Sequence, residues 1–232
     1  MSRRILWGAR FVLFAVAGGA ALLGIAMTLY PGGTALDAHA RGHSFWLNFL
    51  CDLTASVARN GVANPAGSLV ARGAMLVLSV GLGATWLVVP VFFPGAPGDQ
   101  RGAARLVRAA GALCTVALVA VPLVSGAAHI AAIFTSAAAG LTAGVSTVVA
   151  LARSRGPARR WVLFVAVLAA TAADSIFYAQ AVHARPQAPR PELPAVQRVG
   201  LLLALAWMVA TALEVLLAHR RRHSAAGRPS RS

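Results

Sequence analysis

The sequence contains no lysine, only six acidic residues and only two cysteines in 232 positions. Cys51 and Cys114 are too few for a disulfide framework, and neither belongs to a C-x-x-C pair or to a Cys/His spacing that binds zinc. All 21 basic residues are arginines, and the chain is rich in alanine and glycine. This bias is typical of a GC-rich bacterial genome, and it indicates no particular mechanism.

Motifs of known catalytic chemistry are missing as well. The sequence has no P-loop, no serine-nucleophile motif and no G-x-G-x-x-G followed by a strand. His39, His43, Asp52 and His129 are residue types that bind zinc, but no pair of histidines on one predicted helix fixes a geometry. The sequence therefore predicts no metal site and no cofactor, and it gives catalysis little support.

What the chain does have is apolar residues. Hydrophobic residues make up 58% of the chain and charged residues 12%, whereas soluble domains have about 45–50% and about 25%. The net charge is +15, but nucleic-acid binding needs basic residues gathered on one surface. Here the arginines stand at the ends of apolar runs. The composition therefore predicts an integral membrane protein whose partners are membrane lipids, with no nucleic acid among them.

Six apolar runs approach or exceed the roughly 20 residues that a membrane-spanning helix needs. They cover residues 11–29, 69–93, 106–124, 130–151, 161–182 and 199–218. The first run is longer than the apolar region of a signal peptide, about 7–15 residues, so we expect it to be retained. Pro122 and Gly126 favour a tight reversal between the third and fourth runs. The sequence thus predicts a single all-α domain, a six-helix membrane bundle, with a basic disordered tail over 219–232.

The arginines predict the orientation of this bundle. With six spans, fifteen of the 21 arginines fall on one side of the membrane. Arginine-rich loops stay in the cytoplasm under the positive-inside rule. Both termini are therefore predicted to be cytoplasmic, in the plasma membrane, and the polar segment 30–65 between the first two spans to lie outside.

This outer segment contains a predicted short interfacial helix over residues 44–53. Helical spacing places its apolar and aromatic residues on one face, toward the lipid headgroups, and leaves Asn48 and Asp52 together on another, four residues apart. At the start of the second span, Ser68 is a candidate helix cap. Arg72 is placed to pair with Asp52 or Asp37.

Two acidic residues lie inside predicted spans. Asp174 is about eight residues, or ~12 Å, from the outer boundary, and Glu214 is about four residues, or ~6 Å, from the inner one, so the two are not expected to pair. Tyr178 lies one helical turn beyond Asp174, and His129 begins the fourth span at the same boundary. An outward-facing polar cluster of these residues is one interpretation, and a hydrogen-bonded structural aspartate is the other.

Small residues recur every four positions along the fourth span, at Ser136, Gly140 and Gly144. Such a ridge lets a neighbouring helix approach closely. It predicts helix packing within the bundle or, alternatively, a homo-oligomer contact through the Gly140/Gly144 face.

The outer segment resembles a known family. The matching residues are Tyr30-Pro31-Gly32-Gly33-Thr34, Gly42-His43-Ser44-Phe45-Trp46, Asn48 to Leu53, and Asn64 before the second span. The segment is similar to the bacterial membrane family called domain of unknown function 998, which is related to the FRAG/DRAM/SFK-like six-span membrane proteins. Cys51 and Thr54 stand where that family usually has Ser and Gly, while His129 fits its pattern. The resemblance implies the six-span fold and brings no established activity.

These observations favour a membrane protein that binds or organises lipid without catalysis. The alternatives are a membrane-embedded hydrolase with an outward-facing Asp/His site and a small transporter, although the paired interrupted helices of many transporters are not evident. The catalytic candidates would be Asp52, His129, Asp174 and Tyr178. The candidate ligand-binding residues are Asn48, Asp52, Asn64, His129 and Asp174.

Overall fold

A computed structural model describes residues 2–93, 101–152, 159–183 and 192–226 of the chain. Its helices in chain order are α1 (Arg3–Leu29), α2 (Leu50–Thr54), α3 (Pro65–Val88), the short 3₁₀ helix η1 (Val89–Phe92), α4 (Arg101–Ala120), α5 (Gly126–Ala152), α6 (Arg159–His183) and α7 (Glu192–Ala226). Over these ranges the only β-type pairings are two isolated bridges.

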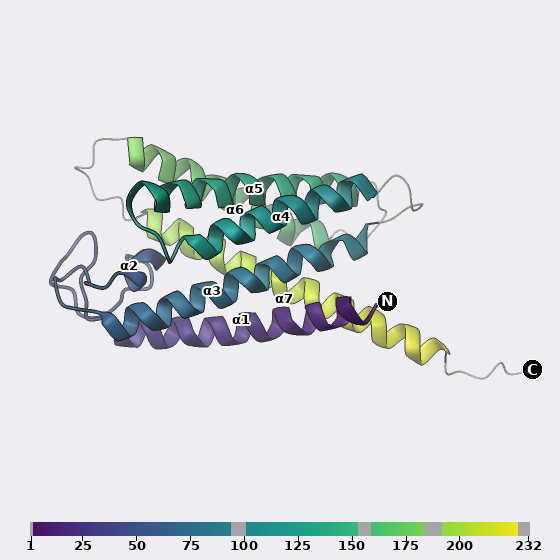
Figure 1. The fold of residues 1–232 in the computed structure, drawn as a ribbon, viewed down its shortest axis with the longest axis horizontal. Coiled ribbons are helices and arrows are strands. Elements are labelled where there is room, and N and C mark those ends of the chain that lie inside the picture. The colour runs from purple at the N-terminus through teal and green to yellow at the C-terminus, as the bar shows by residue number, and fades with distance from the viewer. Residues whose placement is uncertain (1, 94–100, 153–158, 184–191, 227–232) are drawn as a thin grey trace, which may run out of the picture.

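Six of these helices are long and apolar enough to cross a membrane, counting α3 with η1 as one. The protein is therefore an all-α, multi-pass membrane protein, and the predicted six-span bundle is confirmed. The beginning of α1 and the far end of α7 lie together at one end of the bundle, and α2 lies at the opposite end (Figure 1). We call these the termini end and the loop end.

The six long helices form a closed ring. Each packs against the next in the chain, and α7 returns to pack against α1. α3 also contacts α7 across the ring, so α1 lies on one side of this contact and α4, α5 and α6 lie on the other (Figure 1). This arrangement leaves α3 to α7 surrounding a common interior, and α1 packs against the same hydrophobic core through Ala9 and Val12.

Small residues allow the helices to approach one another. A side chain at Gly19 of α1 would meet Leu78 of α3, and one at Gly81 of α3 would meet Ala15 of α1. Lipid gives apolar helices no hydrophobic reason to associate, so such close approach supplies much of the packing energy.

The small-residue ridge of α5 is used in the same way. A side chain at Gly140 would meet Cys114 of α4, and one at Gly144 would meet Leu168 of α6. Both glycines therefore serve packing within the bundle. The homo-oligomer contact through the Gly140/Gly144 face stays a prediction.

The helix boundaries differ from the predicted ones mainly at the two ends of the chain. α1 begins at Arg3, so its three arginines lie on the helix, and α7 begins at Glu192 and continues to Ala226. Residues 219–226 of the predicted disordered tail are therefore helical, and 227–232 lie outside the described residues. The reversal between α4 and α5 is confirmed: residues 121–123 form a turn, and Gly126 starts α5 with a φ of 60°.

Candidate functional site

The segment between α1 and α3 folds onto itself at the loop end. Isolated bridges join Gly32 to Arg41 and Val57 to Ala63. Gly33 has a φ of 86°, and a side chain there would collide with the backbone of Arg59 and Asn60, so only glycine fits. We call residues 30–64 the cap.

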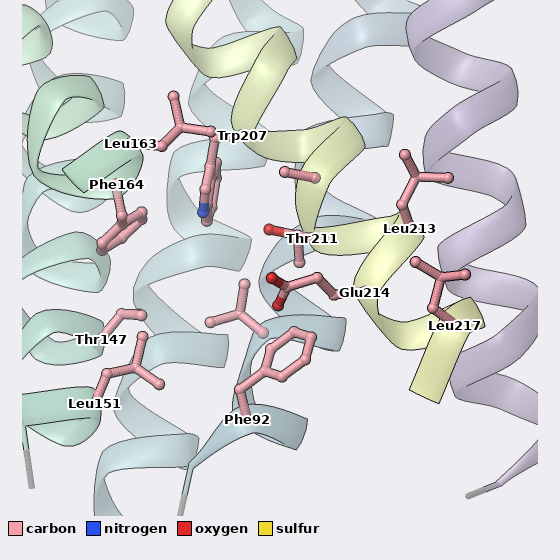
Figure 2. Close-up of a pocket in the computed structure, with 12 residues that line it drawn as sticks. Phe92, Thr147, Leu151, Leu163, Phe164, Trp207, Thr211, Leu213, Glu214 and Leu217 are labelled. Atoms are coloured by element: carbon pink, nitrogen blue, oxygen red, sulfur yellow. The ribbon is translucent and has the colours of Figure 1, made fainter. Parts of the chain in front are cut away.

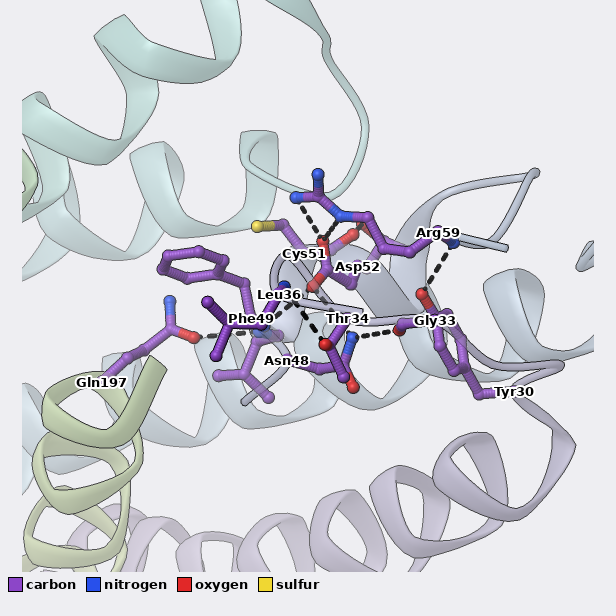
Figure 3. Close-up of polar contacts among 12 residues, drawn as sticks. Tyr30, Gly33, Thr34, Leu36, Asn48, Phe49, Cys51, Asp52, Arg59 and Gln197 are labelled. Carbon is purple, nitrogen blue, oxygen red and sulfur yellow. Dashed lines mark hydrogen bonds and ion pairs between the residues drawn. The ribbon is translucent and has the colours of Figure 1, made fainter. Parts of the chain in front are cut away.

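A polar network holds the cap together (Figure 3). The Asn48 side chain is fully buried, and its Nδ2 donates to the Gly33 carbonyl at 2.8 Å and to Asp52 Oδ2 at 3.2 Å. Asp52 Oδ1 accepts from Arg59 Nε and pairs with its Nη2, both at 2.9 Å. The Tyr30 hydroxyl accepts from the Arg59 amide at 3.0 Å. Asn48 and Asp52 therefore meet as predicted, but they bind the cap's own groups.

The helix expected over residues 44–53 is shorter in the structure. Only Leu50–Thr54 is α-helical, and the residues before it form turns. The predicted aromatic face toward the headgroups does not form as a unit: Trp46 is half exposed, Leu53 is fully buried, and Phe49 and Leu50 face a cavity inside the bundle. A single helical period could not describe a segment that changes conformation halfway.

Helix α3 fixes the other end of α2. Asn64, 2% exposed, is the residue preceding α3, and its Nδ2 donates to the carbonyls of Leu53 and Ala55. Ser68 does not cap α3 as expected, because its hydroxyl donates to the Thr54 carbonyl at 2.6 Å. Arg72 donates to the same carbonyl, and the described partner of Asp52 is Arg59 rather than Arg72.

Two residues of α7 attach the cap to the bundle, and no sequence pattern predicted this role. Gln197 Oε1 accepts from the Leu50 amide at 2.9 Å. Arg198 is fully buried, and it donates through Nε to the Phe45 carbonyl at 2.8 Å and through Nη2 to the Asn48 carbonyl at 2.9 Å. This buried arginine thus joins two distant segments through carbonyl acceptors, while its Nη1 has no hydrogen-bond partner among the described residues. Its position directly before an apolar run was the only available signal.

Two titratable groups of the cap are held in their neutral forms. Burial and then the positive charge of Arg198 lower the pKa of His43 to about 4, so the ring accepts from Arg198 Nη2 at 3.3 Å. Burial and then the negative charge of Asp52 raise the pKa of the Cys51 thiol to about 11. Because the thiolate is the nucleophilic form of cysteine, Cys51 is not an activated nucleophile.

Beneath the cap lies a cavity of about 300 Å³, which we call the loop-end cavity. Phe49, Leu50 and Cys51 of the cap segment close it, and helices α3 to α7 all contribute to its walls. Most of the lining is apolar. Its deepest aromatic residues, toward the middle of the bundle, are Trp86, Phe164 and Trp207.

Polar side chains gather in the part of this cavity that is nearest the cap. His129, Asp174, Tyr178 and Gln197 all line it. His129 Nδ1 lies 2.9 Å from the Val121 carbonyl, so in the neutral ring Nδ1 carries the proton and Nε2 remains an acceptor. The Asp174 carboxylate has no hydrogen bond or ion pair with any residue that the structure describes. At this end the cavity thus offers two acceptors, Asp174 and His129 Nε2, beside the Tyr178 hydroxyl and the donor N–H groups of Gln197.

The structure divides the predicted site residues into two groups. His129, Asp174 and Tyr178 line one cavity, as their depths suggested. Asn48, Asp52 and Asn64 do not line it and belong to the packing of the cap. Asp174 and Glu214 line different cavities. Among the described residues, no three His, Cys, Asp or Glu side chains are grouped so as to hold a metal ion.

Comparisons with protein-family models, with curated proteins and with solved structures find no match to this chain.

Proposed function

We propose that this protein binds a single-chain amphipathic molecule of the membrane in its loop-end cavity, and that it does so without catalysing a reaction. One observation carries the proposal: a mostly apolar cavity inside the bundle has its polar groups gathered at one end. Ligand sites commonly have about 300–1,000 Å³ of mainly apolar volume with a few placed polar groups. The cavity lies at the lower limit of that range, which favours one acyl chain over a two-chain lipid.

The polar groups define the head of this molecule. Asp174 and His129 Nε2 are acceptors, while Gln197, whose Oε1 is already occupied by the Leu50 amide, contributes N–H donors. A carboxylate in a low-dielectric interior favours a partner that donates hydrogen bonds, above all a positively charged one. The head is therefore an ammonium, guanidinium or hydroxyl group rather than a carboxylate. The hydrocarbon chain of the bound molecule points toward Trp86 and Trp207.

The separation of the polar groups from the aromatic residues along α6 fits a bound single-chain molecule. Asp174 lies ten residues along α6 from Phe164, a rise of ~15 Å in an α-helix. The polar groups and the aromatic floor are therefore separated by about half of a hydrocarbon core, ~30 Å thick. A molecule bound this way keeps its head near the membrane surface and its chain at membrane depth.

The orientation is part of the proposal. With the arginine-rich termini end in the cytoplasm, the cap faces outward in the plasma membrane, and the molecule is taken from the outer leaflet. A hydrolase finds less support, since Asp52 is bound by Arg59 outside the cavity and the Cys51 thiol stays protonated.

The test uses dodecylguanidinium, whose head is always charged and donates hydrogen bonds. Native mass spectrometry of the purified protein counts bound probe, and we expect one molecule per chain with weaker binding of dodecanoate. Asp174→Asn should lower the affinity about 10- to 100-fold, the loss of one charge-assisted hydrogen bond of about 1.5–3 kcal/mol.

Asp37→Asn is the matched control, because Asp37 is an exposed carboxyl of the same end of the molecule. It should bind the probe as the wild type does. Equal binding of guanidinium and carboxylate probes, or equal binding by wild type and Asp174→Asn, would contradict the proposal.

A further inference from the structure

A second cavity lies directly below the first. It has a volume of about 360 Å³ and is lined by residues of η1, α5, α6 and α7 near the termini end; we call it the termini-end cavity (Figure 2). Phe164 and Trp207 line both cavities. The two spaces are therefore separated by side chains and not by backbone.

Together the two cavities extend along the whole membrane-spanning height of the bundle. On α5, His129 lines the loop-end cavity and Leu151 lines the termini-end cavity. The 22 residues between these positions rise ~33 Å along an α-helix. A hydrocarbon core is ~30 Å thick. The residues that line the two cavities therefore span about the height of a hydrocarbon core.

The partition consists of three aromatic rings. The Trp207 ring lies 5.1 Å from that of Trp86 and 4.9 Å from that of Phe164, measured between ring centroids. Trp86 Nε1 is buried and has no hydrogen-bond partner among the described residues. Side chains in a close-packed core cannot change rotamer without displacing neighbours, but Trp207 has open volume on both of its sides. Trp207 and Phe164, which line both cavities, are therefore the rings of the partition best able to move.

The termini-end cavity also carries polar groups. Glu214 and Thr211 line it, and their oxygen atoms lie near each other below Trp207 (Figure 2). Each cavity therefore has one carboxylate, Asp174 on one side of the partition and Glu214 on the other. A positively charged head therefore meets a carboxylate on both sides.

We infer that the two cavities are halves of one translocation path, and that the Trp207 ring, packed between Trp86 and Phe164, is its gate. The protein then moves a single-chain amphipathic cation between the two faces of the membrane, with the head passing from Asp174 toward Glu214. This inference rests on the proposed binding function and adds transport to it.

The test measures movement of dodecylguanidinium across phosphatidylcholine vesicles that contain the purified protein. Valinomycin and potassium remove the membrane potential that a moving cation would build. Cyclodextrin strips the probe from the outer leaflet at timed points, and the protected fraction reports the probe that has crossed. We expect the wild type to raise the rate at least fivefold over protein-free vesicles, and Trp207→Ala to raise it further.

A second variant separates transport from binding. Ala210→Phe fills the termini-end cavity, so it should reduce the rate to that of protein-free vesicles while leaving dodecylguanidinium binding by the loop-end cavity intact. Ala206→Phe is the matched control, since Ala206 is an exposed alanine of the same helix. If Ala210→Phe fails to fold, Leu163→Phe narrows the same cavity.

The outcomes distinguish the two proposals. Normal binding with no acceleration by the wild type, or with an unchanged rate in Ala210→Phe, overturns the transport inference and leaves the binding function standing. Absence of binding by the wild type overturns both.

Discussion

Arg198 Nη2 donates to the carbonyl of Asn48 at 2.9 Å, although 150 residues separate them in the chain. The bond joins the first turns of the last helix to the middle of the cap. It is one of three contacts from this guanidinium to the cap, the others reaching the Phe45 carbonyl and the His43 ring. The Phe45 ring also lies 5.2 Å from the guanidinium carbon. The roof of the loop-end cavity is therefore fixed from the far end of the sequence.

We predict that Arg198→Met detaches the cap. It leaves the carbonyls of Phe45 and Asn48 without a donor, which costs about 2 kcal/mol of unfolding free energy. Thermal unfolding in detergent should show the loss, and Cys51 should react faster with a maleimide in a Cys114→Ser background. Arg41→Met, which removes an exposed cap arginine, should change neither quantity.

The pairing of Asp52 with Arg59 predicts a measurable coupling. The Asp52 side chain is almost fully buried and that of Arg59 is 47% exposed, so solvent screens the pair in part. A double-mutant cycle of Asp52→Asn and Arg59→Gln should give a coupling of about 1 kcal/mol in unfolding free energy. The same cycle with Arg72 in place of Arg59 should give a smaller value. Equal couplings would contradict the assignment.

The lowered pKa of His43 predicts loss of stability in acid. The folded-state pKa is about 4, below the value of about 6.5 in an unfolded chain. Between these pH values the unfolded chain binds more protons, so stability should fall as the pH drops from about 6.5 to about 4. His43→Gln keeps an acceptor for Arg198 and should flatten this part of the pH profile. His39→Gln, at an exposed position, should leave it unchanged.

Close packing of α3 against α4 predicts intolerance of a single methyl group. A side chain at Gly111 would collide with the Cβ and ring of Trp86, a rigid residue that has little room to yield. Gly111→Ala should therefore lower the unfolding free energy by about 1–3 kcal/mol. At Gly18 of α1 an added Cβ meets no atom within 4 Å, so Gly18→Ala should leave stability unchanged or raise it slightly. If Gly111→Ala left the unfolding free energy unchanged, α3 and α4 would be less tightly packed than the structure shows.

The proposed orientation predicts opposite labelling of the two bundle ends. In a chain lacking Cys51 and Cys114, Ala63→Cys should react with a membrane-impermeant maleimide in intact cells. Ser2→Cys should react only after the membrane is permeabilised. Reaction of both from outside, or of neither, would be inconsistent with a cap that faces out and termini that face in.

Much of the fold could be predicted because membrane helices are recognised by length and apolar content alone. The polar start of α7 was missed for the same reason, since residues 192–198 include Glu192, Pro194, Gln197 and Arg198. Pro194 does not prevent a helix there, because a proline in the first turn breaks no hydrogen bond. The structure therefore extends the last helix into a stretch that hydropathy leaves out.

The candidate site was predictable where helical geometry governs it. Depth along α5 and α6 brought His129, Asp174 and Tyr178 to one level, and they share a cavity. In the cap, only the contact between Asn48 and Asp52 was predictable, although Asn48 lies outside α2. Other contacts of the cap, such as the ion pair between Arg59 and Asp52, form because the chain reverses direction. Hydrophobic periodicity does not predict such a reversal.

The clamp from α7 has a consequence for biogenesis. Chains are made from the N-terminus, and domains begin to fold during synthesis. The cap emerges before most of the helices, yet the donors for its Phe45 and Asn48 carbonyls belong to the sixth span. The ring of helices likewise closes only when α7 reaches α1. The fold is therefore completed only when α7 inserts into the membrane. A chain truncated before α7 would lack the α7–α1 contact that closes the ring and the Arg198 hydrogen bonds that hold the cap.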